Sequence, residues 1–243
     1  FYYKGFEKEL VTFSYAKLVI DEIQAYDPHI AAMLLKALEL IDRMGGKVMI
    51  MTATLPKLFL ETLESRQLLR PGSWGKARFA NDELKRHRFR LEQCTLADLT
   101  ESIVQDGMKH KVLVICNTVD QSIQLYNRLT EKMQGKHPVH LLHARFTKED
   151  KSRLEQKVTG FAESGWHEDK QQVETGIWVT TQIVEASLDV DFDKLYTELC
   201  PLDSLFQRMG RCYRVRTYGG ESPNIYITTC DVSGVGSVYD QKI

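Results

Sequence analysis

The class of fold is indicated first by the stretch Lys17-Leu18-Val19-Ile20-Asp21-Glu22-Ile23-Gln24. Its short run of apolar, β-branched residues predicts a buried strand in a mostly parallel sheet. The strand ends in two adjacent carboxylates, Asp21 and Glu22, and open α/β sheets bind ligands just beyond the carboxyl ends of their strands. Acids at that edge suit Mg²⁺, which takes oxygen ligands and holds phosphates. A solvent-exposed acidic turn, common after strands, is the alternative.

The composition is that of an ordinary globular protein, because 43% of the 243 residues are hydrophobic and 27% are charged. This length allows one large domain or two modest ones. The net charge of −1 provides no long-range attraction to nucleic acid or membrane, so nucleic-acid contacts must come from local patches. No apolar run approaches the ~20 residues that a membrane span needs, so no membrane partner is expected. The chain begins at Phe1, and we expect it to be a piece of a longer protein.

The cysteines are odd in number and far apart, at Cys94, Cys116, Cys200, Cys212 and Cys230. Because no C-x-x-C pair occurs, the sequence predicts neither a disulfide framework nor a zinc site. A reducing, cytoplasmic location fits this pattern. Cys116 closes an apolar run, and we expect it in the core.

The first 80 residues predict a strand, a helix and a second strand after a short amphipathic helix within 1–15. Asp27 and Pro28 form an N-cap followed by proline at the first helical position. The helix should end at Gly45-Gly46, and residues 47–51 should form a second buried strand before a helix at 57–66. The apolar face expected for the long helix comprises Ile30, Leu34, Leu38 and Ile41.

A second α/β series follows a polar region that bears glycine, proline and a basic cluster between Lys85 and Arg90. Residues 81–90 are the expected linker, and a solvated surface is the alternative reading of the cluster. The expected domains are therefore 1–80, 81–90 and 91–243. Alternation of strands and helices predicts an open parallel sheet with helices on both faces. The expected strands are 88–94, 111–116, 138–142, 176–180, 194–198 and 224–230, and the helices are 97–108, 119–133, 147–161 and 202–209, with a charged loop at 162–175.

The strongest chemical signal lies in Gln207-Arg208-Met209-Gly210-Arg211-Cys212-Tyr213-Arg214. Its arginines are three residues apart, and this spacing keeps side chains on one side of a helix and its last turn. Guanidinium groups match phosphate oxygens, so the segment predicts a polyanion contact. A basic helix end that interacts with the helix dipole is the alternative.

Five motifs follow one another in a specific order. D-E-I-Q begins at Asp21, T-A-T-L-P follows about 30 residues later, N-T begins at Asn117, T-Q-x-V-E-x-S-L-D begins at Thr181, and Q-R-x-G-R-x-x-R begins at Gln207. This order resembles motifs II to VI of the superfamily 2 helicases. The fuller strings D-E-I-Q-A-Y-D-P, M-T-A-T-L-P and L-L-H-A-R-F look most like the CRISPR-associated helicase-nuclease of type I interference systems. The resemblance covers residues 17–216.

The resemblance implies a nucleotide site for ATP and Mg²⁺. Asp21 would hold Mg²⁺ through water, and Glu22 would polarise the attacking water. Gln24 would approach the γ-phosphate, although many relatives carry histidine there. The remaining implied residues are Asp189 near the ribose, Gln207 near the γ-phosphate, Arg211 and Arg214 as arginine fingers, and Arg208 in support of them.

The resemblance also implies contacts with single-stranded DNA. Thr52 and Thr54 would couple the nucleotide state to strand binding, and Ser187 replaces a glycine found in many relatives. The chain contains no G-x-x-x-x-G-K-[ST] phosphate loop and no His-Asp doublet for a metal nuclease. The residues implied to contact the DNA backbone are Asn117, Thr118, His143, Arg145, Thr180 and Thr181.

Together these features predict an α/β protein with two RecA-like lobes, the first of them incomplete. The implied function is that of an ATP-dependent single-stranded DNA translocase or helicase in CRISPR type I antiviral defence. Its implied partners are a crRNA-guided surveillance complex and a nuclease domain or subunit outside this chain. The chain alone is expected to be inactive because it lacks the phosphate loop. The alternatives are another superfamily 2 DNA or RNA helicase, and a non-catalytic nucleic-acid-binding or docking module.

Overall fold

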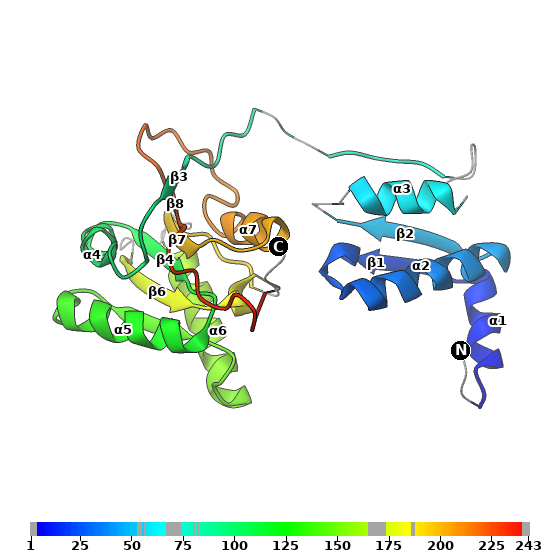
Figure 1. The fold of residues 1–243 in the computed structure, drawn as a ribbon, viewed down its shortest axis with the longest axis horizontal. Helices are drawn as coiled ribbons and strands as arrows, with labels where there is room; N and C mark the ends of the chain where they lie inside the picture. The colour runs from blue at the N-terminus through cyan, green and yellow to red at the C-terminus, as the bar shows by residue number, and fades with distance from the viewer. Residues whose placement is uncertain are drawn as a thin grey trace. The chain divides into compact units, whose positions relative to one another are not determined.

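The structure is a computed structural model that describes residues 4–52, 55, 57–66, 74–79, 81, 83–164, 174–185 and 188–239. The chain divides into two compact units, residues 1–80 and 81–243. Each unit contains a parallel sheet and its own helices (Figure 1), which confirms the expected α/β class. Among the described residues, no helix combines the length and the apolar character needed to cross a bilayer.

Unit 1 contains the two-stranded sheet expected from its sequence. Strands β1 (Lys17–Asp21) and β2 (Lys47–Met51) pair in parallel and are joined by α2 (Pro28–Arg43). The Asp27 carboxylate accepts a hydrogen bond from the His29 amide at 2.8 Å, which caps the start of α2 as expected. The unit also contains α1 (Glu7–Tyr15), the short helix η1 (Ile23–Ala25) and α3 (Lys57–Ser65).

The expectation that both strands of unit 1 are buried is wrong for one face of the sheet. Leu18 and Ile20 of β1 join a hydrophobic cluster with residues of α2 and α3. On the opposite face, Val19 and Met49 are each 55% exposed. The difference arises because apolar runs predict burial on both faces, whereas the described helices pack against one.

The apolar face of α2 differs from the expected one in its first two turns. Ile30 is 44% exposed, whereas Ala31 and Leu35 are buried together with the correctly predicted Leu38 and Ile41. Positions 31, 35 and 38 follow the i, i+4, i+7 pattern of a helix stripe. Apolar residues occur on both sides of this stripe, so the periodicity alone did not settle its direction.

Unit 2 contains a fully parallel, six-stranded sheet in the order β3-β8-β7-β4-β6-β5. Every strand and helix expected beyond residue 88 is present, with boundaries shifted by a few residues. The strands are β3 (Phe89–Glu92), β4 (Lys111–Ile115), β5 (Val139–Leu142), β6 (Gly176–Thr180), β7 (Lys194–Glu198) and β8 (Ile225–Thr228). The helices are α4 (Thr100–Gly107), α5 (Val119–Met133), α6 (Lys148–Glu163), η2 (Gln182–Val184) and α7 (Leu202–Met209).

The sheet of unit 2 separates two hydrophobic clusters. Val112 and Val114 of β4 pack with residues of α4 and α5, while Leu113 and Ile115 face the side of α6 and α7. All residues of β4 and β6 are buried, as expected for central parallel strands. Cys116 is fully buried, as predicted, and all five cysteines are free thiols.

The segment expected to be a linker, residues 81–90, belongs to unit 2 and is bonded to other segments of that unit. The Arg86 guanidinium donates to the Arg214 carbonyl at 2.9 Å, and His87 Nε2 lies 2.8 Å from the Cys212 carbonyl oxygen. The Arg88 amide donates to Asn224 Oδ1 at 2.7 Å. These bonds attach the basic cluster to the segment that follows α7.

Candidate functional site

The first group of candidate residues lies at the carboxyl ends of β1 and β2. Thr52 Oγ1 is 2.7 Å from Gln24 Oε1 and 3.1 Å from Glu22 Oε2, and Gln24 Nε2 donates to the same carboxylate oxygen. The fold thus joins D-E-I-Q to the threonine that follows β2. Asp21 ends β1 with an exposed side chain. Thr54, the second threonine expected here, lies outside the described residues.

Glu22 adopts an unusual backbone conformation at this edge. Its φ of 49° and ψ of 52° place a non-glycine residue in the left-handed region, which is uncommon for an L-residue and disfavoured by about 1–3 kcal/mol. Its amide donates to the Met51 carbonyl at 2.9 Å, and this bond holds the residue beside β2. Such backbone conformations are concentrated at functional sites.

The two carboxylates Asp21 and Glu22 suit the way proteins hold Mg²⁺. Within the described part of the chain, no group of three or more His, Cys, Asp or Glu side chains could form a protein-only metal cage. Mg²⁺ commonly uses one or two carboxylates and takes its other ligands from water and phosphates. The donor set at the end of β1 therefore fits a phosphate-bound Mg²⁺.

The second group of candidate residues is the arginine motif, of which only Arg208 lies within α7. Arg208 is fully buried, and its Nε lies 2.7 Å from the Glu185 carboxylate. Its other nitrogens donate to Thr197 Oγ1 and the Tyr239 hydroxyl, each at 2.8 Å. Arg208 is therefore held in the interior of unit 2, and its support of the arginine fingers stays a prediction. The three arginines differ in burial, because the Arg208 side chain is 0% exposed whereas that of Arg214 is 39% exposed.

Arg211 and Arg214 follow the helix and have different partners. Arg211 donates to the carbonyl oxygens of Leu188, at 2.6 Å, and of Glu185. Its Nε is buried and has no acceptor among the described residues. Burial lowers the pKa of Arg211, and the neighbouring Arg214 charge adds to this effect. Arg214 Nε lies 2.6 Å from Asp189 Oδ1, so Asp189 orients an arginine in this structure.

A buried carboxylate, which was not among the residues predicted from the sequence, clamps the segment after α7. Asp191 is fully buried and accepts from the Arg214 amide and from Arg216 Nε, each at 2.9 Å. Arg216 Nη1 also contacts Asp193 Oδ1 at 2.9 Å. Two sequence patterns could have predicted this clamp, namely the alternating acids at 189–193 and the R-x-R of 214–216. This clamp fixes the backbone that carries Arg211 and Arg214.

Gln207 is partly buried in the last turn of α7. Its expected place near a γ-phosphate stays a prediction. Ser187 lies outside the described residues.

The residues expected to contact DNA differ in their exposure. The Asn117 amide donates to Glu198 Oε2 at 2.7 Å, which ties the end of β4 to the end of β7. Thr118 caps α5 by accepting from the Gln121 amide, and its side chain is partly exposed. The expected contact residues with buried side chains are Asn117, His143, Thr180 and Thr181.

The turn after β5 presents Arg145 to solvent. His143 Nδ1 accepts from the Arg145 amide at 3.3 Å, and its ring stacks on Phe146 with centroids 4.3 Å apart. Burial lowers the pKa of His143, which favours a neutral imidazole. The exposed Arg145 guanidinium contacts Asp120 at 2.6 Å. A phosphate contact of Arg145 stays a prediction.

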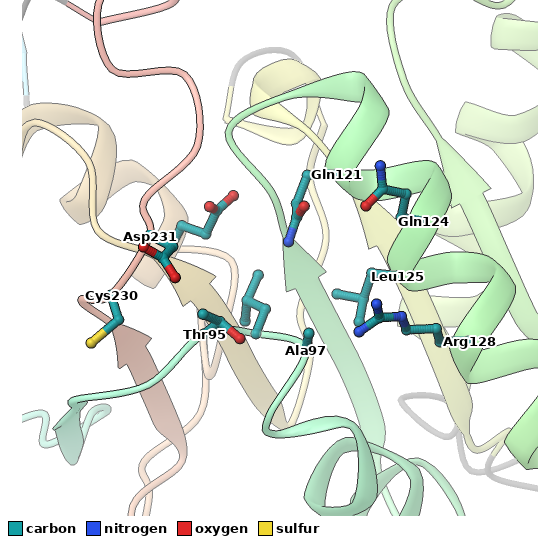
Figure 2. A pocket seen from close by; sticks show the side chains of 10 residues that line it. Thr95, Ala97, Gln121, Gln124, Leu125, Arg128, Cys230 and Asp231 are labelled. Atoms are coloured by element: carbon teal, nitrogen blue, oxygen red, sulfur yellow. The ribbon is translucent and has the colours of Figure 1, made fainter.

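A pocket of about 190 Å³ also opens at the carboxyl edge of the sheet. Figure 2 shows Gln121, Gln124 and Arg128 of α5 on one side and Cys230 and Asp231, which follow β8, on the other. Its lining combines polar and apolar side chains, and it includes none of the candidate site residues from the sequence.

Residues 108–217 match the family model described as "CRISPR-associated nuclease/helicase Cas3, C-terminal". The chain is Cas3-like. A Cas3 nuclease/helicase of Methanothermobacter thermautotrophicus is 32% identical to it, over 99% of the Cas3-like chain and 29% of the relative. The Cas3 endonuclease/helicase of Escherichia coli K12 is 35% identical, over 90% of this chain and 28% of the relative. The Cas3-like chain thus spans less than a third of the length of these curated relatives.

Solved structures show the same fold. The crystal structure of T. fusca Cas3-ATP matches the Cas3-like chain with a TM-score of 0.70 at 20% sequence identity. The match covers 87% of the Cas3-like chain and 29% of the T. fusca chain. A chain of the structure described as "CRISPR RNA-guided surveillance complex, pre-nicking" matches with a TM-score of 0.68 at 20% sequence identity. The match covers 87% of the Cas3-like chain and 31% of the chain in that structure. These matches confirm the RecA-like α/β fold expected from the sequence.

Proposed function

We propose that this chain carries motor elements of an ATP-dependent helicase of CRISPR type I interference that translocates on single-stranded DNA. The proposal includes recruitment by a crRNA-guided surveillance complex and a nuclease domain or subunit outside this chain. The Cas3-like sequence supports it. The solved T. fusca Cas3-ATP structure supports ATP as the nucleotide, and the surveillance-complex structure supports the partner.

The observation that carries the proposal is the bonding of Arg211. Arg208, Arg214 and Arg216 each contact a carboxylate, whereas Arg211 donates to two uncharged carbonyl groups. Its positive charge is therefore held in place without a bonded carboxylate among the described residues. Guanidinium groups bind phosphate oxygens well, and an arginine finger can raise phosphoryl-transfer rates by roughly 10³–10⁵. We assign the finger role first to Arg211 and second to Arg214.

The acidic edge of unit 1 supplies the hydrolytic half of the proposal. Asp21 would hold Mg²⁺, which when bound neutralises charge on the phosphates. Glu22 positions the attacking water and polarises it. Thr52 contacts both Gln24 and Glu22, so a change at the nucleotide alters the backbone that follows β2. This contact is the proposed link between the nucleotide state and the grip on DNA.

The proposed DNA contacts are divided by exposure. Arg145 and Thr118 offer side chains, because both are at least partly exposed. Asn117, Thr180 and Thr181 are buried, so we propose that their segments contribute through backbone groups and by holding the edge rigid. Asp189 supports Arg214 in this proposal, and a direct ribose contact would require it to leave that arginine.

The test measures DNA-stimulated ATP hydrolysis in a full-length protein that carries this chain. Arg211→Ala should lower kcat by roughly 10³-fold, or about 4 kcal/mol of barrier at 1.36 kcal/mol per decade. Glu22→Gln should abolish hydrolysis and leave ATP binding intact. Arg153→Ala is the matched control, because Arg153 lies exposed on α6 and pairs with a neighbouring acid, Asp150. Normal turnover by Arg211→Ala would show that the finger assignment is wrong.

The alternatives give different results in the same assay. An RNA helicase would be stimulated by RNA at least as strongly as by single-stranded DNA. A non-catalytic binding module would show no change on Glu22→Gln, while its affinity for DNA would still fall with salt in proportion to the phosphates it neutralises. The acidic pair at the end of β1 favours the enzyme, because binding alone requires no Mg²⁺ carboxylates.

A further inference from the structure

The segment after β8 crosses the carboxyl edge of the sheet in unit 2. We call residues 229–239 the C-terminal strap. The Thr229 amide donates to the Glu92 carbonyl at 3.0 Å. Farther along, the Ser233 amide and hydroxyl donate to the two Glu198 oxygens at 2.8 and 2.9 Å. Figure 2 shows the start of the strap at Cys230 and Asp231, on the rim of the pocket.

The end of the strap is a compact turn with a defined shape. Gly234 and Gly236 have φ values of +82° and +78°, a conformation that favours glycine. The amides of Val238 and Tyr239 donate to the Gly234 carbonyl at 2.7 and 2.9 Å. A Cβ atom on Gly234 would lie 3.1 Å from the Val238 Cβ. The turn therefore fixes the direction in which the Tyr239 side chain leaves the strap.

The Tyr239 hydroxyl lies at a junction of three motifs. Its oxygen accepts from Arg208 Nη2 at 2.8 Å and is 3.2 Å from Gln182 Nε2. Gln182 Nε2 also donates to the Asn117 carbonyl at 2.6 Å. Tyr239 itself belongs to none of these motifs, and burial raises its pKa, so the hydroxyl stays protonated and neutral.

A continuous set of contacts runs from Tyr239 to Arg211. Tyr239 bonds to Arg208, whose Nε contacts the Glu185 carboxylate at 2.7 Å. The Glu185 backbone carbonyl in turn accepts from Arg211. Arg208 uses Nη2 for the hydroxyl, so loss of the hydroxyl leaves a buried charged donor without that acceptor.

We propose that Tyr239 is a positioning residue of the arginine motif, through which the C-terminal strap sets the geometry of Arg211. This inference rests on the proposed function of Arg211 in ATP hydrolysis. It adds a residue beyond the helicase motifs and makes the strap a part of the motor. Movement of the strap away from the sheet edge would remove the Tyr239 acceptor from Arg208 and, through Glu185, loosen Arg211.

The test compares two tyrosine variants of the full-length protein. Tyr239→Phe removes only the hydroxyl and should lower the kcat of DNA-stimulated ATP hydrolysis about tenfold, with little change in the KM for ATP. Its thermal midpoint should fall by no more than a few degrees, because the ring remains and one buried donor loses its acceptor. Tyr218→Phe is the matched control: its hydroxyl donates to the Ser222 carbonyl at 2.8 Å, outside this network, and kcat should not change.

Hydrogen–deuterium exchange supplies a readout that does not require ATPase activity. In Tyr239→Phe the amides of 182–185 and 208–212 should exchange faster than in the wild type, and in Tyr218→Phe they should not. If the wild-type protein hydrolysed no ATP, the proposed function would fail while exchange still tested the network. Unchanged exchange in Tyr239→Phe overturns the inference. Faster exchange with an unchanged kcat overturns the positioning role.

Discussion

The buried ion pair between Arg208 and Glu185 leads to the sharpest prediction for the packing of unit 2. Its two side chains are 0% and 8% exposed, and Nε lies 2.7 Å from Oε1. Arg208→Met keeps the apolar stem and removes the charge, which leaves Glu185 buried without its counter-ion. Removing one partner of a buried pair is typically destabilising by about 3–5 kcal/mol.

The pH dependence of this penalty has a defined sign. Burial raises the pKa of Glu185, and the Arg208 charge opposes that shift. Without Arg208 the pKa of the Glu185 carboxyl in the folded variant rises further above its unfolded-state value of about 4.5. The raised folded-state pKa contributes its full stabilisation of the variant at pH values below about 4.5. That contribution is lost as the pH rises through the folded-state pKa. The difference in stability between the wild type and Arg208→Met should therefore widen from pH 5 to pH 8.

Urea and thermal unfolding of the chain at pH 8, followed by circular dichroism, measure the effect. A loss of about 3–5 kcal/mol corresponds to a fall of roughly 6–20 °C in Tm for a unit of this size. The double variant Arg208→Met with Glu185→Leu should recover most of the loss, since a buried pair can be replaced by apolar residues at little net change. Arg153→Met, at an exposed pair, should change stability by less than about 0.5 kcal/mol.

A loss below about 1 kcal/mol for Arg208→Met would refute the reasoning. So would a double variant that is no more stable than the single one. The first result would mean that solvent reaches the pair in solution. The second would mean that the hydrogen bonds to Thr197 and Tyr239, rather than the charge, stabilise this region.

Two further predictions concern pH and activity. Burial lowers the pKa of His140 to about 4, and the Lys157 charge contributes. The unfolded chain therefore binds this proton more readily than the folded one. As the pH falls from about 6.5 to about 4, the free energy of unfolding of unit 2 should decrease by roughly 1–2 kcal/mol, after allowance for solvent screening. Urea unfolding of His140→Leu should show a flatter pH profile, and an unchanged slope would contradict the assignment. The chain alone should show no DNA-stimulated ATP turnover, since it contains no G-x-x-x-x-G-K-[ST] loop; robust turnover by the purified chain would overturn this prediction.

Local signals were sufficient for most of the fold. The run Lys111–Cys116 predicted a central strand because continuous apolar residues bury both faces, and Asp27-Pro28 predicted the start of α2 because a cap depends on neighbouring residues only. The same logic failed for Val19 and Ile30. Whether an apolar face is covered depends on elements that pack from elsewhere in the chain, which periodicity does not report.

The sequence alone specifies three features, because each is a property of residue identity. They are the acidic pair Asp21-Glu22, the arginine spacing and the order of the motifs. Which groups point inward was decided only by the tertiary structure. Asn117 and Arg208 are residue types that often contact ligands. Here both are buried and hydrogen-bonded to partners more than 10 residues away in the chain. Glu185, Asp191 and Tyr239 acquire their roles from contacts between segments that are distant in sequence. Charge and hydrogen-bonding capacity can be predicted from a single residue, whereas the partner that satisfies them is set by the packing of the whole unit.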